Sequence, residues 1–313
     1  MKILVTGAAG FIGSHAAQAL KATGAEVIGI DNFNDYYDVK QKQANKQLLK
    51  QDGIIVHDLD IRSEKASKFI LKHKPGAIVH LAAMAGVRYS IEKPLLYFNT
   101  NVDGTANILA AAKEIRAHVV FGSSSSVYGQ RRNAPFKETD RTDKQISPYA
   151  ASKAAAELIC RTHFLTTGLP VTCLRFFTVY GPRGRPDMAP YKFMKLLLEG
   201  KTITRYGDGS SARDYTYVGD IVSGIVAAVD APNGFQIYNL GNSSPVTLND
   251  FISTLEVVTQ KKAKISQAPI PAGDVLLTFA DISKAQAELG YSPQTSLREG
   301  LEKHYEWFMQ SQD

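Results

Sequence analysis

KILVTGAAGFIG, at residues 2–13, joins an apolar run to a glycine-rich turn and the start of a helical period. Gly7, Gly10 and Gly13 let the backbone turn sharply and approach a pyrophosphate, which the positive end of the helix attracts. The spacing is GxxGxxG, not the GxGxxG of many dehydrogenases, and a glycine-rich turn can be merely structural. Its place directly after an apolar strand favours a dinucleotide site, so we expect Phe11 and Ile12 to contact the cofactor too.

Short apolar runs alternate with helical periods along the first half of the chain. Such alternation, with β-branched residues in the runs, predicts an α/β fold: a doubly wound parallel sheet of the Rossmann type, covered on both faces. The predicted strands are Lys2–Thr6, Val27–Asp31, Ile54–His57, Ala77–Leu81, His118–Ser123 and Val171–Phe176, and the predicted helices are Phe11–Lys21, Val39–Lys50, Ser63–Lys72, Leu95–Ile115 and Tyr149–Thr166.

After about residue 177 the alternation decays and prolines mark frequent turns. We therefore expect residues 1–177 to form a domain of the Rossmann type that binds the cofactor, and residues 178–313 to form mainly a smaller α/β substrate lobe. Parts of 203–240, including strand Ile203–Tyr206 and helix Ile221–Val229, can return to either lobe. Helices are also predicted at Leu248–Thr259 and Leu297–Met309.

Composition is that of an ordinary globular protein, with 44% hydrophobic and 21% charged residues. The sequence contains no apolar run long enough for a membrane span, no signal-peptide pattern and only two cysteines, so we expect a cytoplasmic protein without a membrane partner. The formal charge of +6 comes from dispersed lysines, and no nucleic-acid-binding pattern accompanies them. We expect no nucleic-acid partner and assign no metal site; a small anionic substrate would suit the basic surface.

Tyr149 and Lys153 lie four residues apart in a predicted helix, and therefore on one face of it. A nearby ammonium favours the phenolate and lowers the pKa of the tyrosine, which makes it a base for a hydroxyl proton. The spacing alone is common by chance. With the glycine-rich turn and the serines Ser123–Ser126, which end a predicted strand, it indicates hydride and proton transfer at a secondary alcohol.

Further cofactor contacts are expected where the other strands end. Asp31 ends the second strand, where an acid accepts the adenosine ribose hydroxyls and repels a 2′-phosphate, so NAD is favoured over NADP. A capping aspartate is the alternative reading. Asp60 and Ile61 would suit the adenine edge. The remaining predicted cofactor contacts are Asn32, Leu81, Ala82, Ala83, Thr100 and Phe177.

GxxGxxG, a serine cluster and Tyr-x-x-x-Lys in this order resemble the extended short-chain dehydrogenase/reductase family, which acts on nucleotide sugars. The resemblance runs essentially end to end. It implies a firmly held NAD, a C-terminal lobe that binds the nucleotide diphosphate, and catalytic roles for Tyr149, Lys153 and Ser124. Tyr149 would take the proton of the C4 hydroxyl, Lys153 would hold the nicotinamide ribose and Ser124 would hydrogen-bond O4.

Within that family, GVRYS at 86–90 and RFFTVYGPRGRPDMA at 175–189 look like the UDP-glucuronate 4-epimerases. These enzymes invert C4 of a UDP-hexuronic acid through a 4-keto sugar. Such a β-keto acid loses carbon dioxide easily, so an epimerase must hold the carboxylate charged and hydrogen-bonded. Arg185 is the strongest candidate, with Arg183 as alternative. The resemblance also implies substrate contacts from Arg88, Ser125, Ser126, Thr178, Arg213 and Asp274.

Two positions depart from the family pattern. Met84 stands where relatives often carry glutamine, and Thr100 stands where a cofactor-contacting asparagine is common, although Asn101 follows. Related 4,6-dehydratases carry an Asp-Glu pair where this chain has Ser125 and Ser126, so water elimination is not expected.

Three other functions stay open at this stage. They are a neutral-sugar 4-epimerase acting on UDP-glucose or its N-acetyl relative, a decarboxylase of UDP-glucuronate, and a non-catalytic NAD-binding regulator. The resemblance also implies a homodimer that pairs through the helices predicted at Leu95–Ile115 and Tyr149–Thr166.

Overall fold

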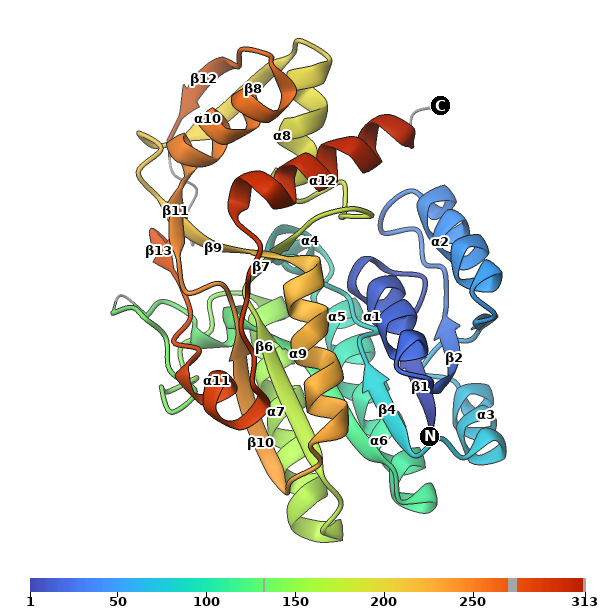
Figure 1. Ribbon diagram of the computed structural model, residues 1–313. Coiled ribbons are helices and arrows are strands. Elements are labelled where there is room, and N and C mark those ends of the chain that lie inside the picture. The colour runs from blue at the N-terminus through green and yellow to red at the C-terminus, as the bar shows by residue number, and fades with distance from the viewer. Residues whose placement is uncertain (132, 270–274, 312–313) are drawn as a thin grey trace.

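The structure is a computed structural model that describes residues 1–131, 133–269 and 275–311 (Figure 1). Asp274, predicted to contact the substrate, lies outside the described residues. A central sheet of seven parallel strands has the order β10-β6-β5-β4-β1-β2-β3, which confirms the predicted fold class. Its strands are β1 (Lys2–Thr6), β2 (Glu26–Asp31), β3 (Ile55–Asp58), β4 (Ala77–His80), β5 (His118–Ser124), β6 (Val171–Phe176) and β10 (Phe235–Leu240).

Helices cover both faces of this sheet, as buried residues of the two faces show. One face carries α1 (Phe11–Ala22), α2 (Val39–Gln51), α9 (Val218–Asp230) and α11 (Ser283–Leu289). The other carries α3 (Glu64–His73), α6 (Gly104–Ile115) and α7 (Pro148–Thr167). Strand order reverses at β1, because β2 lies on one side of it and β4 on the other. Open α/β sheets bind ligands at such a reversal.

The helix predicted at Leu95–Ile115 is present, with one irregular turn inside it. A short helix α4 (Val87–Glu92) precedes it, and the helix itself runs as α5 (Pro94–Phe98), a π-helical turn η1 (Asn99–Asp103) and α6, with right-handed helical backbone at both junctions. In η1 the Asn101 side chain accepts from the Met84 backbone N–H at 2.8 Å and donates to the Met84 carbonyl at 2.9 Å. A π-turn widens the helix locally and often marks a functional site. Here it lets Asn101 fix the chain that leaves β4.

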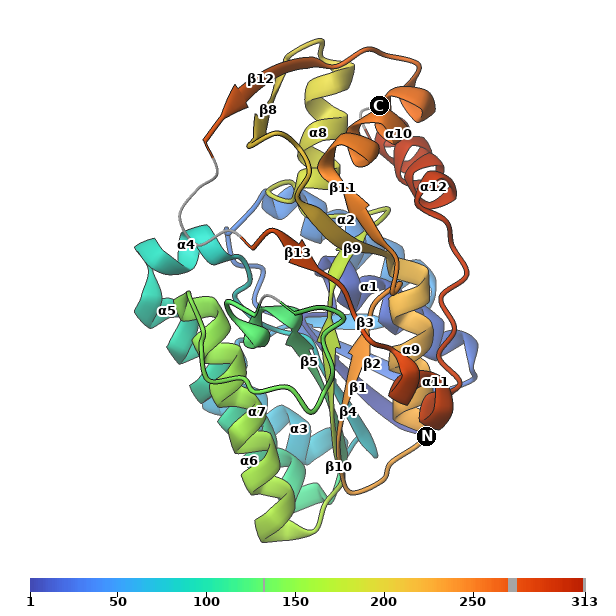
Figure 2. The same ribbon diagram turned by 90° about the vertical axis from the view of Figure 1, so that its left-hand side faces the viewer.

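A second lobe lies above the carboxyl ends of the central strands (Figures 1 and 2). It has its own buried core, which Tyr180, Met194, Phe251 and Leu301 help to build. β9 pairs with β7, β11 and β13, and β8 pairs with β12. Its elements are β7 (Thr178–Tyr180), α8 (Ala189–Leu198), β8 (Thr202–Tyr206), β9 (Ala212–Tyr217), β11 (Pro245–Thr247), α10 (Leu248–Thr259), β12 (Lys264–Ala268), β13 (Leu277–Thr278) and α12 (Leu297–Gln310).

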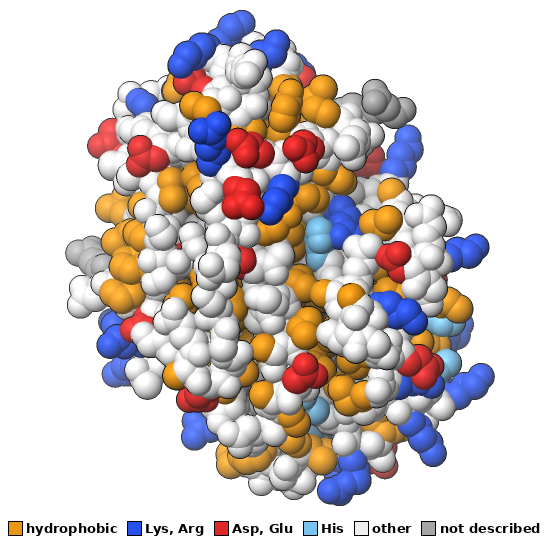
Figure 3. All heavy atoms as spheres, viewed as in Figure 1, with side chains coloured by type: hydrophobic (Ala, Val, Ile, Leu, Met, Phe, Trp, Pro, Cys, Tyr) orange, Lys and Arg blue, Asp and Glu red, His pale blue; other side chains and the backbone are white. Residues whose placement is uncertain are grey.

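The chain between these lobes crosses more than once. The strand predicted at Ile203–Tyr206 is part of β8 and stays in the second lobe, whereas α9 packs on α1 and β10 joins the edge of the central sheet next to β6. Lys and Arg side chains are scattered over the face shown in Figure 3, with Asp and Glu between them. Within the described residues, no helix is long and apolar enough to cross a membrane.

Candidate active site

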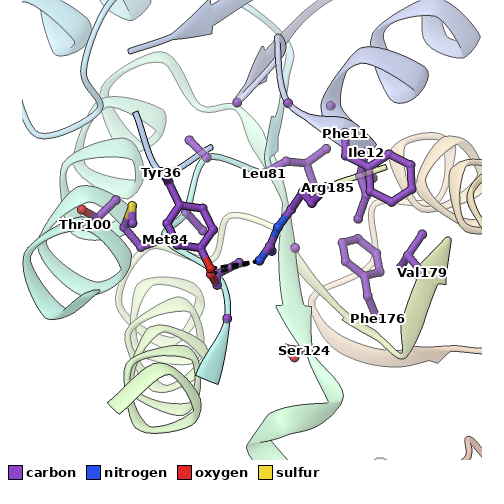
Figure 4. A pocket seen from close by; sticks show the side chains of 18 of the residues that line it. Phe11, Ile12, Tyr36, Leu81, Met84, Thr100, Ser124, Phe176, Val179 and Arg185 are labelled. Carbon is purple, nitrogen blue, oxygen red and sulfur yellow. Dashed lines mark hydrogen bonds between the residues drawn. The ribbon is translucent and has the colours of Figure 1, made fainter. Parts of the chain in front are cut away.

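One pocket lies where the carboxyl ends of the central strands meet the second lobe (Figure 4). Residues that follow β1, β2, β4, β5 and β6 all reach it, although they are far apart in the sequence. Twenty of the predicted site residues line it: Gly7, Gly10, Phe11, Ile12, Gly13, Asp31, Asn32, Ile61, Leu81, Ala82, Ala83, Thr100, Ser124, Ser125, Ser126, Tyr149, Lys153, Phe177, Thr178 and Arg185.

The glycine-rich turn between β1 and α1 fits a dinucleotide pyrophosphate. A Cβ on Gly13 would lie 2.0 Å from the Gly7 carbonyl oxygen, so only glycine allows this tight approach of helix and turn. Gly10 is the N-cap of α1 and, having no side chain, offers no competing acceptor to the first N–H groups of the helix. These groups and the helix dipole together attract an anion. The turn therefore suits the diphosphate of NAD.

Asp31, at the end of β2, combines the two roles considered from the sequence. Its carboxylate accepts from the backbone N–H of Ala9 at 3.1 Å and of Phe33 at 2.9 Å, so it holds the glycine-rich turn against β2. It also lines the pocket. Burial raises the pKa of Asp31, while these two N–H groups and the Lys42 ammonium oppose the rise. Asp31 is thus a structural acceptor that also faces the cofactor site.

Replacing Asp31 by Asn should narrow the preference for NAD over NADP. The substitution removes the negative charge that would repel a 2′-phosphate, and it leaves the Lys42 ammonium, which also lines the pocket, to attract one. Dissociation constants of both cofactors measure the change. Asp58→Asn is the matched control, because Asp58 is the exposed partner of Asp31 on β3 and lies outside the pocket lining. If the ratio of the NAD and NADP dissociation constants is unchanged in Asp31→Asn, the role of Asp31 is structural only.

Helix α7 places Tyr149 and Lys153 one turn apart at its beginning. Ser147 is the N-cap, with its hydroxyl accepting from the Ala150 N–H at 3.1 Å, and Pro148 is the first helical residue. Both are preferred helix-start residues, so the local sequence fixes where the helix begins. Helix α7 packs against β5 and against α4, which follows β4, and Tyr149 lines the pocket.

Tyr149 is partly exposed and packs edge-on against Tyr97, with the ring centroids 6.1 Å apart. Burial raises the pKa of Tyr149, and a hydrogen bond with Ser124 and the positive charge of Arg185 oppose the rise. The sequence predicted a lowered pKa with Lys153 as its cause. The structure differs on both points, because Ser124 and Arg185 are the groups that favour the phenolate here.

Lys153 is buried and reaches toward the sheet. Its ammonium donates to the Gly122 carbonyl at 2.7 Å and lies 4.7 Å from the centroid of the Phe121 ring. Burial lowers the pKa of Lys153 to about 8, although the carboxylate of Glu157 one turn later opposes this. Lys153 also lines the pocket, so its amine stands between the end of β5 and the space available to a cofactor.

The serine cluster sits where β5 ends and the 3-10 turn η2 (Ser125–Tyr128) begins. The Ser124 hydroxyl accepts from the Ser126 N–H at 3.2 Å and donates to the Ser126 hydroxyl at 3.1 Å. These bonds turn the chain so that Ser124, Ser125 and Ser126 all line the pocket. The site therefore offers several neutral hydroxyl groups beside Tyr149.

Arg185 extends into the pocket from the chain between β7 and α8, and it points toward Tyr36 (Figure 4). Its guanidinium forms a bidentate pair with Asp187, at 3.0 and 2.6 Å, and donates to the Ala85 carbonyl at 3.2 Å. Burial alone would lower the pKa of Arg185, but the Asp187 carboxylate outweighs it and raises that pKa. The pocket thus holds a positive charge whose counter-ion comes from the chain itself.

These features together describe a dinucleotide fold with a Ser, Tyr and Lys set at its cofactor pocket. The sequence model of a family described as GDP-mannose 4,6 dehydratase matches residues 4–304. The chain belongs to the extended short-chain dehydrogenase/reductase family.

UDP-glucuronate 4-epimerases and a UDP-glucose 4-epimerase are similar to this chain over nearly its whole length. UDP-glucuronate 4-epimerase 5 from Arabidopsis thaliana is 45% identical over 99% of this chain and 76% of its own length. A UDP-glucuronic acid 4-epimerase from Bacillus cereus, solved with UDP-glucuronic acid and NAD, is 38% identical with a TM-score of 0.93, over 99% of this chain and 100% of the other. A UDP-glucose 4-epimerase from Thermotoga maritima, solved with UDP-glucose, is 31% identical with a TM-score of 0.92, over 100% of both chains.

Several residues predicted for this extended short-chain dehydrogenase/reductase site lie elsewhere. Arg183 packs on α1, where its Nε donates to His15 Nε2 at 3.1 Å, and it does not line the pocket. These contacts favour Arg185 over Arg183 for the carboxylate, and the role considered for Arg183 stays a prediction. Asp60 is not among the lining residues and accepts from the amide of Asn32, which is one of them, at 3.0 Å. Its contact with the cofactor stays a prediction.

Arg88 and Arg213 also stand outside the pocket lining. Arg88 is exposed on α4 with its guanidinium 5.4 Å from the Tyr206 ring centroid, so it bridges to the second lobe. Arg213 donates to its neighbouring Ala212 carbonyl at 3.0 Å. Their substrate contacts remain predictions from the resemblance.

Sequence reasoning missed Tyr36, Asn101 and Asp187. Tyr36 lines the pocket, and it is reached only because the chain after β2 folds back over the site. Asp187 lies in the motif that drew attention to Arg185, and its spacing of two residues from an arginine was the available signal. Asn101 donates to the Ser152 hydroxyl at 2.9 Å in addition to its Met84 contacts, so it joins η1 to α7.

Proposed function

We propose that this protein is an NAD-dependent isomerase that converts UDP-glucuronate to UDP-galacturonate by inverting C4. The observation that carries the proposal is the meeting of Ser124, Tyr149 and Arg185 in one pocket with the glycine-rich turn. The similarity of almost the whole chain to UDP-glucuronate 4-epimerases supports it.

NAD, held by the glycine-rich turn and Lys153, would supply the acceptor for the C4 hydride and the donor for its return to the other face of the sugar. Tyr149 would take the C4 hydroxyl proton and later give it back, with Ser124 hydrogen-bonding O4. Lys153 would hold the nicotinamide ribose, since its ammonium stands between the sheet and the pocket. The proton and the hydride both return to the sugar, so the reaction has no net redox change.

The uronate is favoured over a neutral sugar because a cation and hydroxyl donors share the pocket. Arg185, Ser125, Ser126 and Thr178 line it and suit a carboxylate. Ser125 and Ser126 cannot act as the acid and base of a dehydratase at neutral pH. Holding the carboxylate in its charged state also disfavours loss of carbon dioxide, which separates an epimerase from a decarboxylase.

NMR of the products formed from UDP-glucuronate tests the proposal. UDP-galacturonate is the expected product. A UDP-pentose would indicate a decarboxylase, turnover of UDP-glucose alone would indicate a neutral-sugar epimerase, and no turnover of either sugar would favour an NAD-binding regulator.

The purified protein should carry NAD without any addition. A hydride that returns to the sugar in every cycle requires no exchange of cofactor, so nothing selects for easy release. Denaturing the protein and assaying the supernatant for NAD measures this. A protein that is empty and also fails to bind added NAD would refute the cofactor assignment.

We also propose a domain division and a homodimer. Residues 1–177, with α9 and β10, would bind NAD, and residues 178–313 would mainly bind the nucleotide sugar.

For the homodimer, α7 presents Leu158 and Leu165, which are 66% and 69% exposed. Sedimentation measures the oligomeric state: the wild type should sediment as a dimer and a Leu158→Lys variant as a monomer.

We propose a cytoplasmic location as well, with which the free thiols of Cys160 and Cys173 agree.

A further inference from the structure

Arg185 has two hydrogen-bonding edges, and Asp187 occupies one of them. Its Nε and Nη2 atoms donate to the two Asp187 carboxylate oxygens at 3.0 and 2.6 Å. Nη2 also donates to the Ala85 carbonyl at 3.2 Å. Among the residues that the structure describes, Nη1 has no hydrogen-bond partner, and Arg185 lines the pocket. One edge of the guanidinium is therefore used inside the protein, and the other is left for a ligand.

Tyr36 and Gly86 lie against the Arg185–Asp187 pair. The Tyr36 hydroxyl donates to Asp187 at 3.0 Å. Arg185 Nη2 donates to the same hydroxyl at 3.4 Å, and the guanidinium lies 5.2 Å from the Tyr36 ring centroid (Figure 4). A Cβ on Gly86 would lie 2.5 Å from the Tyr36 oxygen and 3.3 Å from Arg185 Nη2, at a backbone φ of 108°. The cluster is packed too closely for a side chain at Gly86. Arg185 is thus held by close packing, and it is paired with an Asp187 side chain that is itself 38% exposed.

A 4-epimerase has a particular need for a carboxylate contact of limited strength. The 4-keto sugar must turn in the pocket between its oxidation and its reduction, and its carboxylate must leave its first partners to do so. A free arginine fork would hold the carboxylate through two parallel charged hydrogen bonds, which is the strongest arrangement available. An arginine whose fork is already occupied presents less charge and fewer donors.

We propose that Asp187 is a positioning residue that limits the grip of Arg185 on the sugar carboxylate. It occupies the Nε/Nη2 edge, aims the Nη1 edge at the substrate and partly neutralises the guanidinium charge. This inference rests on the proposed function, since it concerns a uronate that turns during the reaction. It makes Asp187 a determinant of how the enzyme balances uronate affinity against turnover.

Asp187→Asn is the informative variant, because a merely structural role would change binding in the opposite direction. The variant should bind UDP-glucuronate about tenfold more tightly, the size of one charge-assisted hydrogen bond, and turn it over several-fold more slowly. Affinity for UDP-glucose should stay unchanged. Calorimetry with both sugars and steady-state kcat and KM for UDP-glucuronate measure these effects. Asp187→Glu, which keeps the charge, should restore the wild-type balance.

Asp35→Asn is the matched control, because Asp35 is an exposed carboxylate next to Tyr36 that lies outside the pocket lining. It should leave both affinities unchanged. Weaker or unchanged binding of UDP-glucuronate by Asp187→Asn would overturn the inference, and so would equal tightening for UDP-glucose, which would assign Arg185 to the diphosphate. A wild type that makes no UDP-galacturonate would instead refute the proposed function, and this result is obtained before any variant is compared.

Discussion

Tyr149→Phe should lower the turnover of UDP-glucuronate by about 10²–10⁴-fold, the usual contribution of a general acid–base, while NAD stays bound. The substitution removes only the hydroxyl, so the edge-on contact with the Tyr97 ring is retained. Product formation in a single-turnover assay and the NAD content of the purified variant measure the two parts of this expectation.

Tyr305→Phe provides the matched control for that experiment, because Tyr305 lies on α12 in the second lobe and does not line the pocket. Its turnover should equal that of the wild type. Near-normal turnover in Tyr149→Phe would show that another group acts as the base. A Tyr149→Phe protein without NAD would show instead that the phenol hydroxyl helps to hold the cofactor.

The central sheet could be predicted from the sequence because its strands are short apolar runs between clear breaks. The predicted bounds of β1 and β6 agree with the structure at both ends. The helix at 95–115 could be predicted too, but the π-turn inside it could not, since the apolar period continues through Thr100 and Asn101. Asn101 in that turn contacts Met84, 17 residues away, and a local pattern carries no information on such a contact.

The candidate catalytic residues were accessible to sequence reasoning because their signals are local. Tyr149 and Lys153 share a helix face, and Ser124 ends a strand. The direction in which Lys153 points was not predictable, because the nearest strong acceptor is the Gly122 carbonyl on β5, 31 residues before it. A spacing of four residues places two side chains on one face, but it does not decide which neighbour each one contacts.

In a loop, too, local sequence does not decide which neighbour a side chain contacts, as Arg183 and Arg185 show. The two residues are separated by a single glycine, yet Arg183 packs on His15 of α1 and Arg185 enters the pocket. Their different directions depend on chain segments that come from far away in the sequence. Tyr36 and Asp187, which hold Arg185, are themselves 151 residues apart.

Arg185→Met should weaken the binding of UDP-glucuronate far more than that of UDP-glucose. Loss of a charged hydrogen bond is worth roughly 1.5–3 kcal/mol, or about ten- to 150-fold in affinity. The variant also leaves Asp187 without its bidentate partner. That unpaired carboxylate near the pocket would repel a uronate and not a neutral sugar, so the discrimination should increase further. Dissociation constants for both sugars measure it.

Arg298→Met is the control for the loss of one positive charge, because Arg298 is exposed on α12. It should leave both affinities unchanged. Equal losses for the two sugars in Arg185→Met would place Arg185 on the diphosphate, and the preference for a uronate would then have to come from the hydroxyl donors Ser125, Ser126 and Thr178.

The same variant should also make a product that the wild type does not make. Once C4 is a ketone, the C6 carboxylate is β to it, and its C5–C6 bond breaks when the carboxylate can leave the ketone plane. The electron pair passes to the enolate, which takes a proton at C5, and carbon dioxide leaves. The resulting UDP-4-ketopentose becomes a UDP-pentose when the hydride that was removed from C4 is returned to it. Without Arg185 to hold the carboxylate, carbon dioxide and a UDP-pentose should accompany a reduced yield of UDP-galacturonate. A variant that is slow but forms only UDP-galacturonate would show that Arg185 does not restrain the carboxylate.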